Sequence, residues 1–528
     1  MLNADQQELT PSELTPSELT PSELAIQQIL DARARALDGC PDARRRLTAL
    51  FDDDRAGSGG SDGSGGFVEY GLLAGRTSDV EDDAPSDGLV GGVGEIDGRP
   101  VMAASYDRSV ADGTQSDRNQ RKLSKLIYLA RTNRWPLVLF VEGDGARPTD
   151  PRPVPPIVVY TRGRWDSYDG LAELSGWAPT VAIITGPTVD GHAGAAFLCD
   201  LVIGVAGATV GSLDRAADGS PAARTARTVE ELAARADVDL VAADEAEAIE
   251  LARRYLRYWF DEPDTAADAA RPSSTHERIG RIVPDNRRRP YDMRKLVEAF
   301  ADEGSILELG RAYAPSMITA LARLDGRSVG IFANQPFSPN AGAIDAVAAD
   351  KAARFVELCD AYGLPLVSFI DNPGYMVGPD AERAGIARHH ARPLSALQHR
   401  QVPLYAVQVR KAYGLGPYAM SGYGSSRKVP ELRLAWPSVE SGGMSLEGAA
   451  YLVKRKEIRA AEDPVEARAI RDRYAEQMRE VASGVRAGRT YSFDDVVLPG
   501  ETRDRIIAML IRSPRVLPAA KTHPIDPR

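Results

Sequence analysis

The sequence predicts an α/β protein that contains two similar domains in tandem. One unit, made of a hairpin, a helix and an apolar strand that ends at a glycine, occurs twice in the chain. Lys122 aligns with Lys351 and Gly145 aligns with Gly374 without a gap, so the helix, the strand and the terminal glycine keep one register. Such a repeat indicates a duplicated domain. The length of 528 residues also suits about two domains of roughly 200 residues.

Three segments follow one another along the chain. Residues 1–90 are predicted to form a low-complexity and helical extension, because Glu-Leu-Thr-Pro-Ser repeats with a period of five residues through residues 8–24. A helical pattern over residues 24–37 follows a Thr-Pro-Ser-Glu run with capping-box spacing. Strands and helices alternate from Gly91 onward. We place the two repeated domains at residues 91–289 and 290–528.

The elements of the first copy follow from local patterns. Residues 96–101 read Ile-Asp-Gly-Arg-Pro-Val, in which Asp-Gly is a hairpin signal. A helical stretch follows, and the apolar run at residues 136–141 reads as a buried strand that ends near Gly145. A second apolar strand at residues 181–184 leads toward Gly191.

The second copy shows the same order of patterns. Residues 324–329 read Leu-Asp-Gly-Arg-Ser-Val, and a helical stretch follows. The apolar run at residues 365–370 ends near Gly374, and a further strand at residues 404–407 leads toward Gly416. Each copy is therefore expected to bring two strands to glycine turns at one end of its sheet.

The composition argues against two classes of partner. The formal charge of −11, the lack of a long Lys or Arg run and the aromatic fraction of 6% are atypical of nucleic-acid grooves and membrane surfaces. The chain has no apolar run of ~20 residues and no signal-peptide pattern, so we expect a cytoplasmic protein. Cys40, Cys199 and Cys359 are scattered and form no CxxC pair, which indicates reduced thiols and no metal site.

The glycine turns are the candidate functional site. A strand that stops at a small residue and opens a helix leaves backbone N–H groups without partners, and the helix dipole favours negative charge there. Two such turns that face one another make an oxyanion hole, which would stabilise the enolate of a thioester in the transition state. The motif alone leaves a second interpretation open, because glycine at such turns often serves only tight packing.

Nine segments of the chain match one family of enzymes. They are residues 112–116, 143–148, 289–296, 305–309, 341–345, 348–355, 371–378, 411–420 and 435–437. Through them the chain resembles the carboxyltransferase (beta) subunits of biotin-dependent acyl-CoA carboxylases, of the propionyl-CoA and acetyl-CoA carboxylase type. The likeness extends over about residues 91–499 and is stronger in the second half. It implies an α/β fold of two tandem crotonase-like (ββα-spiral) domains.

The resemblance implies a mechanism with two sites and no side-chain nucleophile. The amino-terminal domain, residues 91–289, would hold the acyl-CoA, and the carboxy-terminal domain, residues 290–528, would hold biotin. Each domain would stabilise one negative oxygen through backbone N–H groups. The catalytic amides are expected at Gly145, Gly191, Gly374, Leu415 and Gly416. Substrate-binding residues are expected at Asp144, Ala146, Asp190, His192, Tyr375 and Tyr418.

The resemblance also implies partners. It implies a biotin carboxylase and biotin carrier subunit, and a homo-oligomer that is a dimer or a trimer of dimers. The chain has no Met-Lys biotin-attachment pair and no Gly-rich ATP-binding loop, so we expect biotin to reside on a separate carrier protein. The expected substrate is a coenzyme A thioester. No metal, nucleic acid or membrane is expected.

Two aspartates depart from the family pattern. The family has paired glycines at each amino-terminal turn, where this chain has Asp144 and Asp190. A carboxylate beside a forming enolate repels it by roughly 4 kcal/mol at 4 Å and an effective dielectric of 20. Either the aspartates turn away, or this domain has lost the usual role. Tyr418 lies near a position that helps to set the size of the acyl group in the family. The sequence therefore does not identify the acyl group of the substrate.

Each histidine considered for the site also has a purely structural interpretation. His192 either orients a substrate oxygen or is a hydrogen-bonded histidine near a helix start. His389 and His390 are neighbours, and neighbouring side chains on a helix diverge by ~100°, so the pair does not predict a metal site.

The sequence therefore predicts an acyl-CoA carboxyltransferase that moves a carboxyl group from carboxybiotin to the α-carbon of a short acyl-CoA. Two alternative functions remain open. One is a biotin-independent decarboxylase or related enzyme of specialised metabolism, which Asp144 and Asp190 motivate. The other is a non-catalytic partner of an active paralogue, which the stronger match of the second half motivates.

Overall fold

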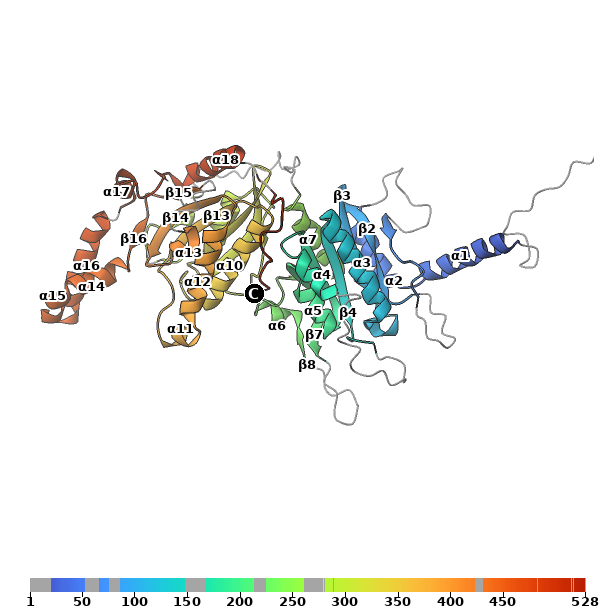
Figure 1. The fold of residues 1–528 in the computed structure, drawn as a ribbon. Helices are drawn as coiled ribbons and strands as arrows, with labels where there is room; N and C mark the ends of the chain where they lie inside the picture. Colours follow the sequence, from blue (N-terminus) through green and yellow to red (C-terminus); the bar gives the residue numbers. More distant parts are fainter. Residues whose placement is uncertain are drawn as a thin grey trace, which may run out of the picture. The chain divides into compact units, whose positions relative to one another are not determined.

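The computed structural model has a mixed α/β fold with two β-sheets (Figure 1), which confirms the predicted α/β class. The pentapeptide repeats expected before Thr20 lie outside the described part of the chain. The structure describes residues 20–52, 66–75, 86–147, 167–212, 225–260, 279, 281–287, 289–422, 431–481, 483–513, 515 and 517–527.

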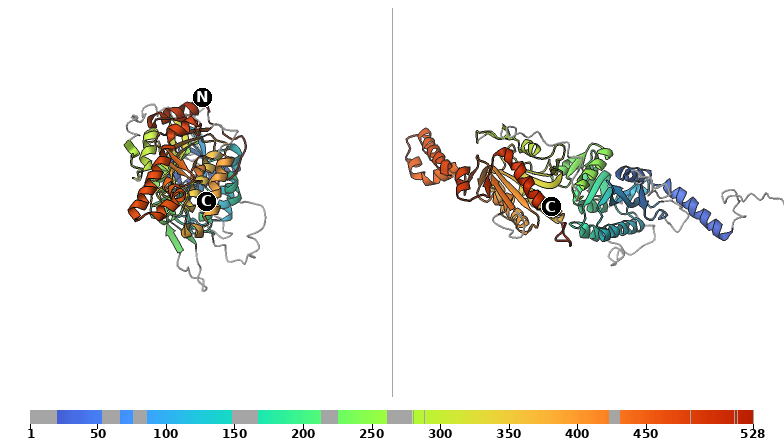
Figure 2. Two further views of the ribbon diagram at one scale, coloured as in Figure 1. Left: turned by 90° about the vertical axis from the view of Figure 1, so that its left-hand side faces the viewer. Right: turned by 90° about the horizontal axis from the view of Figure 1, so that it is seen from above.

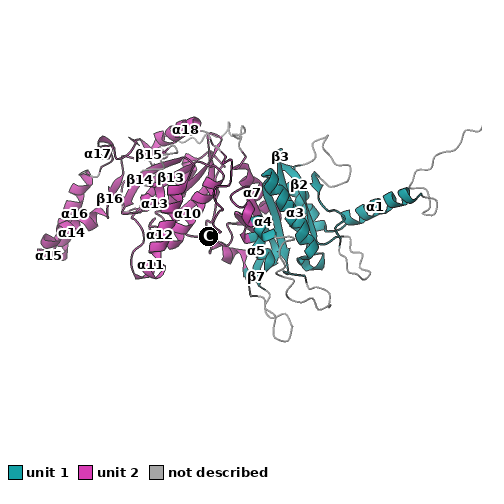
Figure 3. Ribbon diagram, in the orientation of Figure 1, with its two compact units in different colours: residues 1–171, 182–196, 208–227 teal, residues 172–181, 197–207, 228–528 magenta. Residues whose placement is uncertain are grey.

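The chain divides into two compact units (Figure 3). The first comprises residues 1–171, 182–196 and 208–227, and the second comprises residues 172–181, 197–207 and 228–528. Compactness thus groups residues 228–289 with the second unit. The boundary that we expect near residue 290 concerns the repeat in the sequence and stays a prediction.

The first half of the chain contains the expected hairpin, helix and strand. Strands β2 (Leu89–Ile96) and β3 (Arg99–Tyr106) are antiparallel and are joined by a turn in which Asp97 and Gly98 have φ of 50° and 72°. Strand β3 pairs in parallel with β4 (Leu137–Gly143), and β5 (Thr180–Val189) pairs in parallel with β7 (Thr209–Ser212). The remaining elements are α1 (Pro21–Leu37), α2 (Pro41–Leu50), β1 (Phe67–Glu69), a 3-10 turn (Ala111–Gly113), α3 (Asp117–Asn133), α4 (Ser167–Leu174), α5 (Gly191–Phe197), β6 (Leu201–Val205), β8 (Thr225–Thr228), α6 (Val229–Ala233), β9 (Leu240–Ala242) and α7 (Glu245–Arg257).

The second half repeats this order. Strands β11 (Met317–Leu324) and β12 (Arg327–Asn334) form a hairpin, and β12, β13 (Leu366–Asn372), β14 (Leu404–Tyr413) and β15 (Glu431–Ala435) are parallel neighbours. The remaining elements are α9 (Met293–Phe300), β10 (Leu307–Glu308), α10 (Ala346–Ala361), α11 (Pro379–Arg383), α12 (Ile386–His399), α13 (Tyr418–Ser421), β16 (Glu440–Gly442), α14 (Leu446–Val453), α15 (Arg455–Ala460), α16 (Pro464–Val481), α17 (Gly484–Arg489), β17 (Asp495–Val496), a 3-10 turn (Pro499–Glu501) and α18 (Thr502–Arg512).

The second sheet lies between two layers of helices. Val367 and Phe369 of β13 pack with Phe300 of α9 and Ile506 of α18 in one apolar cluster. On the opposite face, α10 lies beside α12 (Figures 1 and 2). Helix α10 also packs on β11 and β12. The absence of a side chain at Gly330 admits this helix, because a Cβ there would lie 3.2 Å from the Phe355 ring. Burial of both sheet faces explains why β13 reads as a continuous apolar run.

Matching details in the two copies confirm the duplication. The buried ammonium of Lys122 donates to Leu89 O at 2.9 Å, and that of Lys351 donates to Met317 O at 2.8 Å. Each lysine thus fastens its helix to the hairpin. An isolated parallel bridge joins Gln115 to Ala146 in the first copy and Ile344 to Tyr375 at the equivalent place in the second.

Candidate functional site

In the second copy, two glycine turns meet at the ends of β13 and β14. Gly374 follows β13 with φ of 110°, a conformation that favours glycine. Gly416 lies so close to this turn that an added Cβ would be 2.9 Å from Gly374 Cα and nearer still to Asn372 Oδ1. The structure therefore brings together Gly374, Leu415 and Gly416, the residues that we singled out in this half of the chain.

The backbone N–H groups of these turns differ in their partners. The Gly374 amide donates to Asn372 Oδ1 at 3.0 Å, and the Gly416 amide donates to Tyr413 O at 3.2 Å. Within the described part of the chain, the amides of Tyr375 and Leu415 donate no hydrogen bond. Leu415 is also 56% exposed. These two amides are the donors that a ligand oxygen can use without breaking an existing bond.

Next to the second turn lies a cavity of about 290 Å³. Tyr418, at the start of α13, forms part of its wall, and its own N–H donates to Leu415 O at 3.1 Å. The remaining lining mixes apolar side chains, such as Ile370 and Leu434, with polar ones that include Gln408 and Arg433. A small group with both apolar and polar parts can therefore enter next to the turn that contains Leu415.

A buried ion pair sets the path of β14 into the turn. Between the pairs Ile370–Gln408 and Asn372–Ala412 the register shifts, so β14 bulges. The Asp371 carboxylate accepts from the bulged Lys411 amide at 3.1 Å and from Arg410 Nε at 3.0 Å. Burial raises the pKa of Asp371, and the Arg410 guanidinium opposes that rise. This pair holds the bulge and hence the Leu415 turn.

The first copy brings its two turns together in the same way. Gly145 follows β4 with φ of 78°, and an added Cβ there would lie 3.3 Å from Asp190 Oδ2. Ala146 is exposed and bridges to Gln115. The Gly145 amide has no acceptor among the described residues. The Gly191 amide begins α5 and has none there either.

The two aspartates of these turns lie in different environments. A carboxylate oxygen of Asp144 is 3.7 Å from Arg108 Nη1, and its backbone amide donates to Asp112 O at 3.2 Å. Asp190 is exposed and has φ of 49°, and its carboxylate lies against Gly145. The charge of Asp144 is therefore opposed by a cation, whereas that of Asp190 is screened by water.

His192 lies behind these turns and is completely buried. Its Nε2 is 2.9 Å from Gly113 O, so the ring must carry its proton on Nε2 to donate this bond. The ring meets Tyr106 edge-on at 4.4 Å. Burial lowers the pKa of His192 to about 4. Of the two interpretations of His192, the hydrogen-bonded histidine near a helix start matches this geometry.

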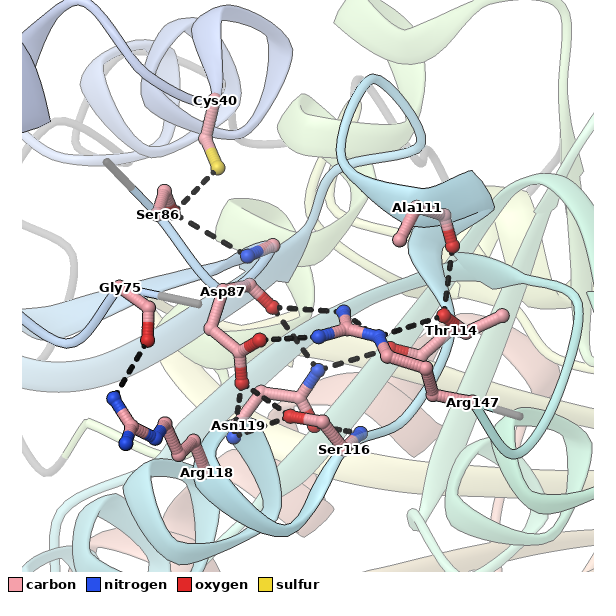
Figure 4. A network of polar contacts seen from close by, with 11 residues as sticks. Cys40, Gly75, Ser86, Asp87, Ala111, Thr114, Ser116, Arg118, Asn119 and Arg147 are labelled. Atoms are coloured by element: carbon pink, nitrogen blue, oxygen red, sulfur yellow. Dashed lines mark hydrogen bonds and ion pairs between the residues drawn. The ribbon is translucent and has the colours of Figure 1, made fainter. Parts of the chain in front are cut away.

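A polar network fixes the segment that follows Gly145 (Figure 4). Arg147 forms an ion pair with Asp87, and its Nε donates to Thr114 Oγ1 at 3.0 Å. Asp87, which is 4% exposed, also accepts from the Asn119 amide at 3.0 Å and from the Ser116 hydroxyl. The charge of the aspartate is thus compensated on several sides, and the Gly145 turn is tied to the start of α3.

The remaining candidates have structural partners. His389 Nδ1 is 2.8 Å from Asp350 Oδ2, and the His390 ring stacks on Tyr375 at 3.5 Å. The described ranges contain no cluster of three or more His, Cys, Asp or Glu side chains suited to a metal ion. All three cysteines are buried thiols. Of the helices that the structure describes, none has the length and apolar character needed to cross a membrane.

Sequence reasoning missed several residues of the site. It did not identify the Tyr375 amide as a donor, the Asn372 side chain that occupies the Gly374 amide, or the pairing of Arg108 with Asp144. The only available signal for Asn372 was its place at the last position of the apolar run before the turn.

Comparisons with known proteins show which family the chain resembles. The family model of the carboxyl transferase domain matches residues 61–521. The methylmalonyl-CoA carboxyltransferase 12S subunit of Propionibacterium freudenreichii subsp. shermanii is 33% identical over 440 residues, 81% of this chain and 81% of that protein. The biotin-dependent long chain acyl-coenzyme A carboxylase beta4 subunit of Mycobacterium tuberculosis is 32% identical over 495 residues, 89% and 88%. The hexameric transcarboxylase 12S crystal structure with methylmalonyl-coenzyme A and methylmalonic acid bound has a TM-score of 0.76 at 29% identity, and the match covers 96% of this chain and 98% of that one.

Proposed function

Because the chain belongs to the carboxyl transferase family, as a carboxyltransferase of biotin-dependent acyl-CoA carboxylases with two crotonase-like domains, we propose that it carboxylates the α-carbon of a short acyl-CoA. The observation that carries this proposal is that each copy joins two glycine turns and leaves N–H groups without acceptors. Such groups stabilise an oxygen that becomes negative in the transition state.

The first copy is proposed to hold the acyl-CoA. The amides of Gly145 and Gly191 would donate to the thioester oxygen, which becomes negative when the α-carbon forms an enolate. The geometry favours this role because neither amide has an acceptor among the described residues. Asp144 faces Arg108, so its charge opposes the enolate less than an unpaired carboxylate would.

The second copy is proposed to hold biotin, which a separate carrier protein would present. When bound, biotin would supply the carboxyl group as carboxybiotin. The residues of this copy fit the group: the Leu415 and Tyr375 amides would hold its carbonyl oxygen, and the cavity beside Tyr418, with both apolar and polar lining, would receive the rest of the group. Gly374 and Gly416 would contribute by allowing the two turns to approach each other closely, since their own amides already have acceptors.

The partners follow from the family and stay proposals. We expect a biotin carboxylase and a biotin carrier subunit as partners. We also expect a homo-oligomer in which the acyl-CoA site of one subunit meets the biotin site of another subunit. A relative of this chain is hexameric, which supports a trimer of dimers. Light scattering that found a stable, active monomer would contradict this arrangement.

The test is transfer of label from carboxyl-labelled methylmalonyl-CoA to free biotin. Carboxyltransferase activity requires that labelled carboxybiotin form in proportion to biotin concentration. Release of labelled CO₂ at a rate independent of biotin would instead favour the decarboxylase alternative, for which Asp190 beside Gly145 is the specific observation.

A further inference from the structure

The two copies of the turn differ by an exchange of side chains. Asp190 and Gly414 are equivalent, because each follows a strand with φ of 49° or 58° and each donates its amide to the neighbouring strand. Two residues further on, the first copy has His192 where the second has Gly416.

The second copy combines a large residue at the end of β13 with a small residue in the turn that follows β14. Asn372, the last residue of β13, donates through Nδ2 to Asn334 Oδ1 at 2.9 Å and accepts the Gly374 amide through Oδ1. Residue 416 must be a glycine to leave room for this carboxamide, because a Cβ at Gly416 would collide with it. The Gly374 amide is therefore occupied.

The first copy has the reverse combination. Gly143, the last residue of β4, takes the place of the asparagine, and an added Cβ would lie 2.8 Å from His192 Nε2 and nearer still to Gly113 O. The imidazole thus fills the space that the carboxamide fills in the other copy. Its Nε2 holds Gly113 O at 2.9 Å, and no side chain takes the Gly145 amide.

From this exchange, and resting on the proposed function, we propose that His192 is a positioning residue of the acyl-CoA site. Its imidazole replaces the carboxamide of the other copy and holds the Gly113 carbonyl, which keeps the Gly145 amide free for the thioester oxygen. His192 does not exchange a proton with the substrate. The pKa of about 4 agrees with this role, since the ring stays neutral throughout the neutral range, and the bond to Gly113 O selects the tautomer with the proton on Nε2.

The inference is tested with His192→Gln and His192→Phe, with His399→Gln on α12 as the matched control. Glutamine can donate to Gly113 O from nearly the same place as Nε2, whereas phenylalanine keeps the ring volume and cannot donate. Three quantities are measured: kcat and KM for propionyl-CoA, the pH profile of kcat, and the carbonyl stretch of bound [1-¹³C]propionyl-CoA by isotope-edited infrared spectroscopy. A thermal melt of each variant checks that it is folded.

We expect His192→Gln to keep kcat within about threefold, the same pH profile and the lowered carbonyl frequency of a hydrogen-bonded thioester. We expect His192→Phe to lower kcat by about tenfold or more, up to the roughly 10²- to 10³-fold loss seen when an oxyanion donor is removed outright. Its KM should change less, and its carbonyl frequency should return toward that of free propionyl-CoA.

Two results would overturn the positioning role. One is loss of a limb of the pH profile in His192→Gln, which would make the imidazole an acid or base. The other is wild-type kcat and carbonyl frequency in a folded His192→Phe. If the wild type itself transfers no carboxyl group and shifts no carbonyl band, the proposed function fails, and the inference fails with it.

Discussion

Substitution of Gly416 by alanine should separate the two turns of the second copy. The new Cβ would lie 2.9 Å from Gly374 Cα, a backbone atom that cannot rotate away. Nonbonded carbons sit at about 3.5 Å or more, so one turn must move by about 0.6 Å. Misplacement by 1 Å costs on the order of 10²-fold in rate. We therefore expect kcat for carboxyl transfer to fall by about 10- to 10²-fold.

The assay is transfer of label from carboxyl-labelled methylmalonyl-CoA to free biotin, with a thermal melt in parallel because overpacking costs about 1–3 kcal/mol of stability. Gly304→Asn is the matched control, since a Cβ there would meet no atom within 4 Å and asparagine tolerates the φ of 71°. The control should retain wild-type transfer. Unchanged transfer in a folded Gly416→Ala protein would show that the close approach of the two turns is not needed for the reaction.

Three further predictions concern charge. Asp190→Asn keeps a residue that tolerates the positive φ and removes a solvated charge whose repulsion of the enolate is about 1 kcal/mol at 4 Å, so kcat/KM for acyl-CoA should rise by about fivefold. Loss of activity would mean that the carboxylate takes part in the reaction. Arg147→Met leaves Asp87 buried without its cation and should lower the free energy of unfolding by about 3 kcal/mol, whereas the double change with Asp87→Ser should cost less in a denaturant titration. Hydrogen bonding to Asp360 raises the pKa of His523 above 6.5, so the stabilisation from this charged contact is complete below pH 6.5 and is lost as pH rises through the raised pKa. The protection of residues 517–527 from hydrogen exchange, taken relative to the intrinsic exchange rate at each pH, should fall over that range in the wild type and stay constant in His523→Gln.

The sequence carried the information for the repeated units because their signals are local. An Asp-Gly turn, an apolar run and a terminal glycine can each be read within a few residues, and the expected helix at residues 24–37 was found as Pro21–Leu37. The meeting of Gly374 with Gly416 also followed, since parallel strands end at one edge of a sheet.

The partners of the backbone amides could not be predicted in this way. Whether the Gly374 amide is free depends on the rotamer of Asn372, which Asn334 of another strand fixes. The environment of Asp144 likewise depends on Arg108, which a separate segment supplies. Such contacts follow from tertiary packing, and no periodicity in the chain reports them.

If each copy of the repeat holds one of the two substrates, two-substrate steady-state kinetics should separate the two sites. Gly145→Ala places a Cβ at a φ of 78° and 3.3 Å from Asp190 Oδ2, so it should impair the acyl-CoA site alone. We expect this variant to raise KM for methylmalonyl-CoA or to lower kcat while leaving KM for biotin unchanged. We expect Gly416→Ala to raise KM for biotin while leaving KM for methylmalonyl-CoA unchanged. The opposite pattern, or equal effects of both variants on both substrates, would contradict the assignment of the two sites.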